Sequence, residues 1–259
     1  MIASIMKDKL LLPCIKLLKT FFSLVAILLV WELIALIIGD SFFMPGVEYT
    51  AKSLLSIISS KTFFDVIFTS IFRVFSGLLI GILLGALLST LCYKIEFFNV
   101  ILSPIISIIK ATPVACIIVL LWIRLNYAEI AIFVVVLMVL PIIWQNLYDG
   151  YKAIDKNLDE VAEVFELARI RRFTVLVIPS LLSYLLPAIV TSVGLAWKAE
   201  VAAEIMTNNN MGRLIYDFKT VSYDTASIFA WTVIIVVTSI IFEKLTKIVF
   251  GRLINELKN

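Results

Sequence analysis

Apolar residues are gathered into long stretches that short polar segments separate. Six stretches are long enough to matter, at about residues 20–38, 66–92, 101–123, 128–147, 176–197 and 226–246. Crossing a hydrocarbon core of about 30 Å takes about 20 mostly apolar residues, and their backbone groups must be hydrogen-bonded within the segment. The pattern therefore predicts an all-α integral membrane protein with about six transmembrane helices. We expect a cytoplasmic N-terminal segment at residues 1–19 and one transmembrane domain at residues 20–259.

The polar loop at residues 149–174, between the fourth and fifth stretches, has a pattern of its own. Eleven charged residues lie between Asp149 and Arg172, although the flanking stretches have almost none. Apolar residues recur at helical spacing, at Leu158, Val161, Ala162, Phe165 and Ala168. Asn157 followed by Glu160 resembles a capping box. This pattern predicts a short amphipathic helix on the cytoplasmic side.

The apolar stripe of this helix could rest on the membrane surface or in a groove of a partner protein. Acidic residues dominate the first half of the helix. An anionic inner leaflet would repel them, which favours the partner protein.

Composition excludes several other classes of protein. Hydrophobic residues make up 62% of the chain and the mean hydropathy is +1.08, so much of the apolar surface must face lipid. The net charge of +3 and the lack of a basic run argue against nucleic acid as a partner. The three cysteines are widely spaced and there is no histidine, which argues against a metal site and His-based catalysis. We therefore expect no catalytic or metal-binding residues, and a membrane enzyme has little support.

Lysine and arginine near the helix ends predict the orientation. With the N-terminus in the cytoplasm, the inside segments hold 14 of these residues and the outside segments hold 6. The first apolar stretch contains Trp31 and Glu32 and no small-residue cleavage site follows it, so we interpret it as a retained span. Both termini are expected in the cytoplasm. Glu32, near the middle of that span, is expected to pair with another helix.

Residues 160–179, EVAEVFELARIRRFTVLVIP, resemble the EAA loop of binding-protein-dependent ABC importer permeases. Glu160, Val161 and Ala162 match the opening of that motif, and Phe173 with Ile178-Pro179 matches its close. Glu166 stands where the family usually has Gly. The local turn is therefore either helical here or altered in geometry.

The resemblance extends over nearly the whole chain. FFMPGVEYT, SIFRVFSGLLIGILLGALL, PIISIIKATPVACIIVLLW and GLAWKAEVAAEIM resemble, in the same order, segments of the nitrate, sulfonate and taurine branch. The resemblance implies a permease subunit in a bacterial cell membrane that imports a small solute. It also implies as partners two ABC ATPase subunits, a second copy of the permease and an extracytoplasmic substrate-binding protein.

The resemblance further implies that the loop is a coupling helix that docks on the ATPase. The residues expected to couple are Glu160, Val161, Ala162, Phe165, Glu166 and Arg169. The chain has no GxxxxGK[ST] motif, so ATP and Mg are expected in the separate ATPase and no cofactor is expected here.

A channel or an ion-coupled secondary transporter is the alternative function. The charged cytoplasmic helix argues against it, and so does the lack of a visible inverted repeat. A soluble ATPase that co-purifies with the chain would support only the importer. The substrate itself cannot be identified from the sequence.

Three groups of polar residues are candidates for the substrate pathway or gate. Lys110 faces a cavity or partner, or else its side chain reaches the inner interface. Gln145 and Asn146 line the pathway or anchor the helix at the interface. The third group, Lys198, Glu200 and Glu204, lines an outer gate, forms a salt bridge to another helix, or lies in an exposed interfacial turn.

Three glycines at a spacing of four predict close helix packing in the second stretch. Gly77, Gly81 and Gly85 lie on one helix face, where small residues let a neighbouring helix approach. That neighbour belongs either to the same subunit or to its twin.

Overall fold

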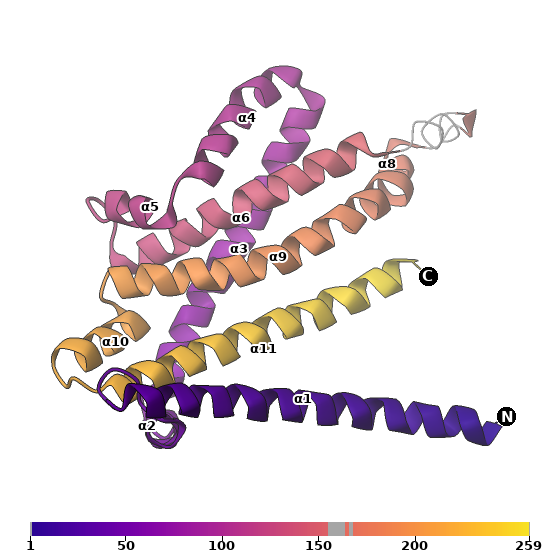
Figure 1. Cartoon of the computed structure of the whole chain (residues 1–259). Helices are drawn as coiled ribbons and strands as arrows, with labels where there is room; N and C mark the ends of the chain where they lie inside the picture. Colours follow the sequence, from indigo (N-terminus) through magenta and orange to yellow (C-terminus); the bar gives the residue numbers. More distant parts are fainter. Residues whose placement is uncertain (1, 155–163, 166–167, 259) are drawn as a thin grey trace. The chain divides into compact units, whose positions relative to one another are not determined.

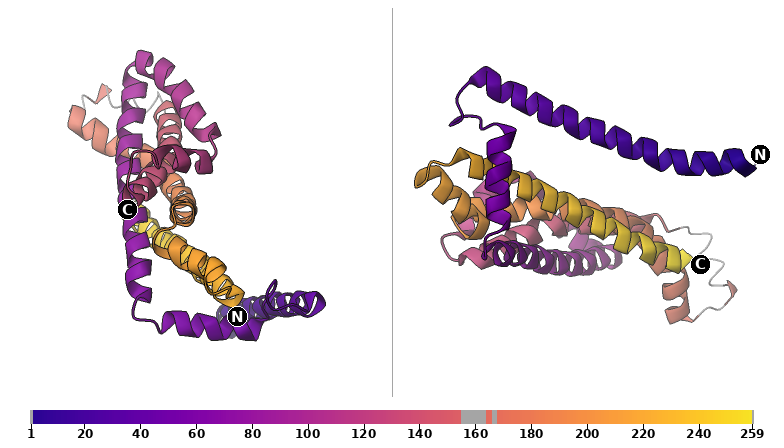
Figure 2. Two further views of the ribbon diagram at one scale, coloured as in Figure 1. Left: turned by 90° about the vertical axis from the view of Figure 1, so that its left-hand side faces the viewer. Right: turned by 90° about the horizontal axis from the view of Figure 1, so that it is seen from below.

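The computed structural model describes residues 2–154, 164–165 and 168–258, and every regular element among them is helical (Figures 1 and 2). The α-helices are α1 (Ile2–Ile38), α2 (Val47–Ile58), α3 (Phe63–Lys94), α4 (Glu96–Ala111), α5 (Val114–Leu121), α6 (Tyr127–Lys152), α8 (Arg169–Arg172), α9 (Ile178–Met206), α10 (Asn210–Thr220) and α11 (Thr225–Lys258). A π-helical turn, η1 (Phe173–Val177), joins α8 to α9.

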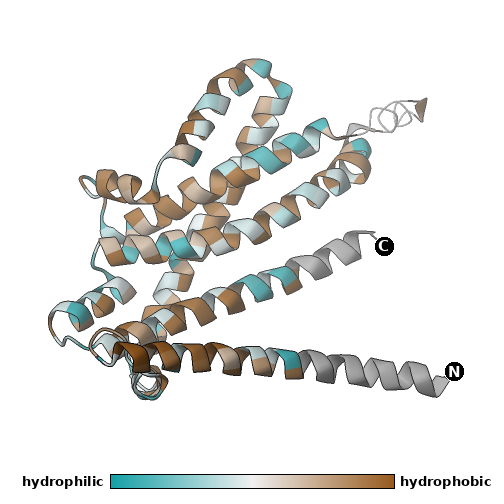
Figure 3. Ribbon diagram, viewed as in Figure 1, coloured by the Kyte–Doolittle hydropathy of each residue, from teal (hydrophilic) through white to brown (hydrophobic). Residues whose placement is uncertain are grey.

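Five helical segments of the described chain are long and apolar enough to cross a membrane. They are Leu18–Ile38, Phe63–Lys94, Tyr127–Lys152, Ile170–Met206 and Thr225–Val249. The bent pair α4 and α5 makes a sixth if it counts as one span. Figure 3 shows that hydrophobic residues predominate in the part of α1 that is coloured by hydropathy. The prediction of an all-α membrane protein with about six spans is confirmed.

The third predicted span, residues 101–123, differs from the single helix that the sequence pattern suggested. The chain forms α4 and α5 there, and their axes meet at 99°. The break lies at Thr112, which has extended backbone angles of φ −77° and ψ 126°. Pro113 follows it, and a proline disfavours the helical conformation of the preceding residue. The other five predicted ranges each lie within one continuous helical segment.

Contacts divide the chain into two compact units. The first comprises Met1–Ser60 with Asp217–Ile234, and the second comprises Lys61–Tyr216 with Ile235–Asn259. The second unit holds α3, α6 and α9, which pack against one another in its core.

The three glycines of the second span lie against α6 of the same chain. A Cβ atom on Gly77 would lie 2.6 Å from Val135, one on Gly81 would lie 2.8 Å from Val139, and one on Gly85 would lie 2.9 Å from Ile143. Any side chain on these three residues would therefore push the two helices apart. The sequence did not decide whether the helix packed on this glycine face belongs to the same subunit or to its twin. In the structure this helix is α6 of the same chain.

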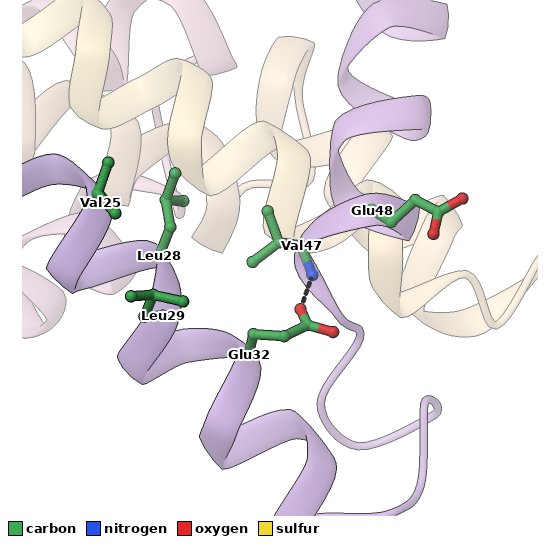
Figure 4. A pocket seen from close by; sticks show the side chains of 6 residues that line it. All are labelled: Val25, Leu28, Leu29, Glu32, Val47 and Glu48. Carbon is green, nitrogen blue, oxygen red and sulfur yellow. Dashed lines mark hydrogen bonds between the residues drawn. The ribbon is translucent and has the colours of Figure 1, made fainter.

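In the first unit, Glu32 of α1 holds the start of α2 (Figure 4). Its Oε2 accepts a hydrogen bond of 2.8 Å from the backbone N–H of Val47, the first residue of α2. Helix N-termini have unpaired N–H groups and a partial positive charge, so a carboxylate is stabilised there. Nearby, the indole N–H of Trp31 donates to the carbonyl of Pro45 at 3.0 Å. The partner expected for Glu32 is thus the N-terminus of α2.

Candidate functional site

The predicted coupling loop connects α6 to α8. Glu160, Val161, Ala162 and Glu166 lie outside the described residues, and of Arg169 only the backbone is described, as the first residue of α8. Three large apolar side chains between residues 164 and 170 are described. Val164, Phe165 and Ile170 are 81%, 73% and 80% exposed, respectively. The loop therefore presents large apolar groups that the described residues of this chain do not cover.

A buried polar cluster forms where α3, α9 and α10 meet, and Glu204 of α9 is at its centre. Its Oε1 lies 2.7 Å from Nη1 of Arg73 in α3, which forms an ion pair. The same oxygen accepts hydrogen bonds from the hydroxyl of Ser70 and the amide of Asn210, each at 2.9 Å. Its Oε2 accepts from the backbone N–H of Met211 at 3.2 Å. The Glu204 residue is 1% exposed, so one carboxylate ties three helices together out of contact with water.

Two backbone features let α10 approach this carboxylate. Asn208 and Asn210 have positive φ values of 51° and 48°, which turn the chain tightly between α9 and α10. Asparagine tolerates this left-handed region better than most residues. A Cβ atom on Gly212 would lie 2.0 Å from the carbonyl oxygen of Glu204, so only glycine fits there.

Glu200, one turn before Glu204 in α9, is in a different situation. Its carboxyl oxygens are buried, and neither has a hydrogen-bond partner in the described part of the chain. The charge of Glu204 acts on it, as does the charge of Arg73. The sequence left open whether these carboxylates line an outer gate, form a salt bridge to another helix or lie in an exposed interfacial turn. In the structure Glu204 forms a salt bridge to α3, and neither carboxylate is exposed.

The remaining pathway candidates are scattered over the second unit. Lys110 is exposed in the last turn of α4, just before the break. Gln145 donates to the carboxylate of Asp149 at 3.1 Å, and Asn146 donates to the carbonyl of Ile142 at 2.8 Å, both within α6. Lys198 is exposed on α9, on a different face from the buried Glu200 and Glu204.

The sequence interpretation missed the partners of Glu204. Arg73, Ser70 and Asn210 were not among the candidate site residues. The available signal was a pair of opposite charges near the N-terminal end of α3 and the C-terminal end of α9. A buried charge in a membrane protein needs a partner, so Arg73 and the acidic pair could have been matched on that ground.

Residues 77–255 match the model of a family described as binding-protein-dependent transport system inner membrane component. The chain belongs to this family. A protein of Bacillus subtilis strain 168 named as an aliphatic sulfonates transport permease, SsuC, is 24% identical over 88% of this chain and 83% of its own length. The nitrate import permease protein NrtB of Synechococcus elongatus is 27% identical over 77% of this chain and 76% of its own.

A solved structure shares the fold. It is a bacterial ABC transporter involved in the import of the acidic polysaccharide alginate, with a TM-score of 0.62 and 15% identity. The match covers 93% of this chain and 98% of that one. The chain is thus a multi-span membrane permease subunit of an ABC importer, and the family resemblance drawn from its motifs is confirmed.

Proposed function

We propose that this chain works as one of two permease copies, each docked on a separate ATPase through the loop at residues 149–174. One observation carries the proposal: Val164, Phe165 and Ile170 are all largely exposed between α6 and α9. Exposed apolar groups in a loop that also carries eleven charges fit a protein groove better than lipid. Members of the family act with an ATPase, so we place the groove that binds this loop on the ATPase subunit.

The coupling is mechanical in this proposal. A docked helix transmits motion only if it is held in one pose. Apolar groups one turn apart, Val161, Ala162 and Phe165, would fill the groove, while Glu160 near the helix N-terminus is favoured by the helix dipole. Arg169 would pair with acidic groups at the rim, and Glu166 takes the place of the family's glycine.

ATP and Mg belong to the ATPase subunit in this assembly, and this chain supplies no catalytic residue. An extracytoplasmic binding protein would deliver the solute, and both termini would lie in the cytoplasm of a bacterial cell. The two relatives are named for aliphatic sulfonates and nitrate. Small solutes of these kinds are therefore the first ones to test.

The cluster around Glu204 would hold the outer end of the pathway in one conformation, and Glu200, Lys110, Gln145 and Asn146 stay candidates for contact with solute.

The test is the composition of the purified transporter. The chain is co-expressed with its ATPase, with an affinity tag on the permease only, and native mass spectrometry weighs the complex. The expected mass corresponds to two permeases and two ATPases. A complex with a single six-span permease, or recovery of the permease without any ATPase, would reject the proposal.

A further inference from the structure

A cavity of about 420 Å³ lies in the angle between α1 and α2, both of which belong to the first unit (Figure 4). Its lining comes from one stretch of α1 and the first two residues of α2: Val25, Leu28, Leu29, Glu32, Val47 and Glu48. The α1 positions are spaced by three and four residues, so they form one face of that helix. Apart from the two glutamates the lining is aliphatic, and the cavity has the size of a small-molecule site.

The direction of α2 indicates where this cavity lies in the membrane. α2 has 12 residues, too few to cross the hydrocarbon core, and it runs across the direction of α1 rather than along it (Figure 2). Its exposed residues include Tyr49 and Lys52 beside apolar ones, which is typical of a helix at a membrane–water interface. Glu32 contacts the start of α2 and therefore lies at head-group level. Val25 is seven residues earlier on α1, about 10 Å deeper, among acyl chains.

Glu32 is the unbalanced charge of the cavity. Its Oε2 accepts the hydrogen bond from the N–H of Val47, and no lysine or arginine among the described residues forms an ion pair with it. Glu48 is paired with Lys52 at 2.6 Å, and its carboxylate points away from Glu32 (Figure 4). A Cβ on Gly46 would lie 3.2 Å from either oxygen of Glu32, so this carboxylate rests on peptide backbone. A cationic group at the mouth of the cavity would therefore meet a net negative charge.

An acyl chain fits this cavity better than a helix of a second copy does. A helix with its side chains is about 10 Å wide, so 420 Å³ would hold only about one turn of it. An apolar helix there would also bury the Glu32 carboxylate without a cationic partner, which is costly. A phospholipid with an ammonium head group supplies both parts, because its chain makes dispersion contacts with the aliphatic end and its ammonium meets the acidic end.

We propose that the angle between α1 and α2 is a binding site for one phospholipid with an ammonium head group, such as phosphatidylethanolamine. One acyl chain lies along Leu28 and Leu29 toward Val25, and the ammonium pairs with Glu32. On the proposed topology this lipid belongs to the outer leaflet. The site needs only the membrane-spanning fold, so it stands or fails separately from the proposed docking of an ATPase.

The experiment is photolabelling in nanodiscs that contain equal amounts of phosphatidylethanolamine and phosphatidylglycerol. The tagged permease, with any subunits that co-purify, is reconstituted with a trace of one or the other lipid carrying a diazirine in its acyl chain. After illumination, mass spectrometry quantifies the labelled peptic peptides. The peptide with Ile240 and Ile241, two exposed residues of α11, is the internal reference for lipid that merely surrounds the protein.

We expect the peptide with Leu28 and Leu29 to be labelled more than the reference, and more by phosphatidylethanolamine than by phosphatidylglycerol. Leu28→Trp fills the cavity and should lower this labelling to the level of the reference. Val30→Trp is the matched control, because Val30 is 55% exposed at the same depth of α1 but lies outside the lining face. Its labelling should stay as in the wild type.

Glu32→Gln tests the head-group contact. The amide oxygen of glutamine can still accept from the N–H of Val47, so the start of α2 is kept while the charge is lost. The ratio of phosphatidylethanolamine to phosphatidylglycerol labelling should fall by roughly two- to fivefold, as for an ion pair near water. Three results would each overturn the inference: labelling no higher than the reference, as when a second copy covers the cavity; equal effects of the two tryptophans; or a ratio that Glu32→Gln leaves unchanged.

Discussion

At the scale of single residues, Glu200 and Glu204 show how strongly surroundings separate two identical side chains. They are one turn apart in α9 and both are almost fully buried. Glu204 neutralises Arg73 and accepts hydrogen bonds from Ser70, Asn210 and the backbone of Met211. The oxygens of Glu200 accept no hydrogen bond within the described chain. The two side chains should therefore contribute very differently to stability.

Glu204→Gln is expected to destabilise the permease strongly, because it takes the counter-charge of Glu204 away from the largely buried Arg73 guanidinium. Removing one partner of a buried pair typically costs about 3–5 kcal/mol. Glu200→Gln is the matched control, and it should cost little because no ion pair or hydrogen bond is lost. Thermal unfolding of both variants in detergent, followed by tryptophan fluorescence, measures the difference. Equal midpoints for the two variants would contradict this assignment.

The sequence could predict that charges at the C-terminal end of α9 matter, but it could not assign their roles. Glu200 and Glu204 share one helical face by spacing alone. Which of them meets Arg73 depends on the tilt of α3 and on the turn at Asn208 and Asn210. Those features are tertiary, and no local pattern encodes them.

At the scale of elements, the packing of α3 on α6 depends on the absence of side chains. Gly77, Gly81 and Gly85 follow one face of α3, and each would bring a Cβ within 3 Å of an α6 side chain. Dispersion contacts are short-ranged, so a close approach along three turns of helix stabilises the pair without any polar group.

Gly81→Ala is expected to destabilise the α3–α6 pair by about 1–3 kcal/mol through overpacking against Val139. Gly194→Ala is the control, because the nearest atom to its new Cβ would be 3.9 Å away. Alanine has a better helix propensity than glycine, so this variant should gain about 0.5–1 kcal/mol. Unfolding midpoints in detergent compare the two. If Gly81→Ala is as stable as wild type, the helices can separate freely and the packing account is wrong.

The elements themselves were largely predictable from hydrophobic length. Five of the six predicted ranges lie within continuous helical segments, since a long apolar run has few other stable conformations in lipid. The break between α4 and α5 was not predicted, although Thr112-Pro113 signals a helix end. The short helices α2 and α10 were also missed, because their apolar runs are too brief to stand out.

At the scale of the whole molecule, the orientation in the membrane follows from the distribution of lysine and arginine. The bias of 14 inside against 6 outside favours the proposed topology, with both termini in the cytoplasm. A fluorescent protein that matures only inside the cell, fused after Asn259, should therefore be bright. An enzyme reporter that works only outside the cytoplasm should be inactive at the same position. Darkness of the first with activity of the second would reverse the proposed topology.

Phe165→Asp tests the central claim most directly, namely that this permease is driven by a separate ATPase docked on the 149–174 loop. A charge in an apolar groove is costly unless it is paired, so the variant should insert and fold normally yet lose its ATPase. Val221→Asp is the matched control, because Val221 is also 73% exposed but lies in the segment between α10 and α11, on the predicted extracytoplasmic side.

The measurement is the amount of ATPase recovered with each tagged permease from the same membranes. We predict loss of the ATPase with Phe165→Asp and full recovery with Val221→Asp. Full recovery with Phe165→Asp, together with normal ATP-dependent uptake, would show that this loop is not the coupling element.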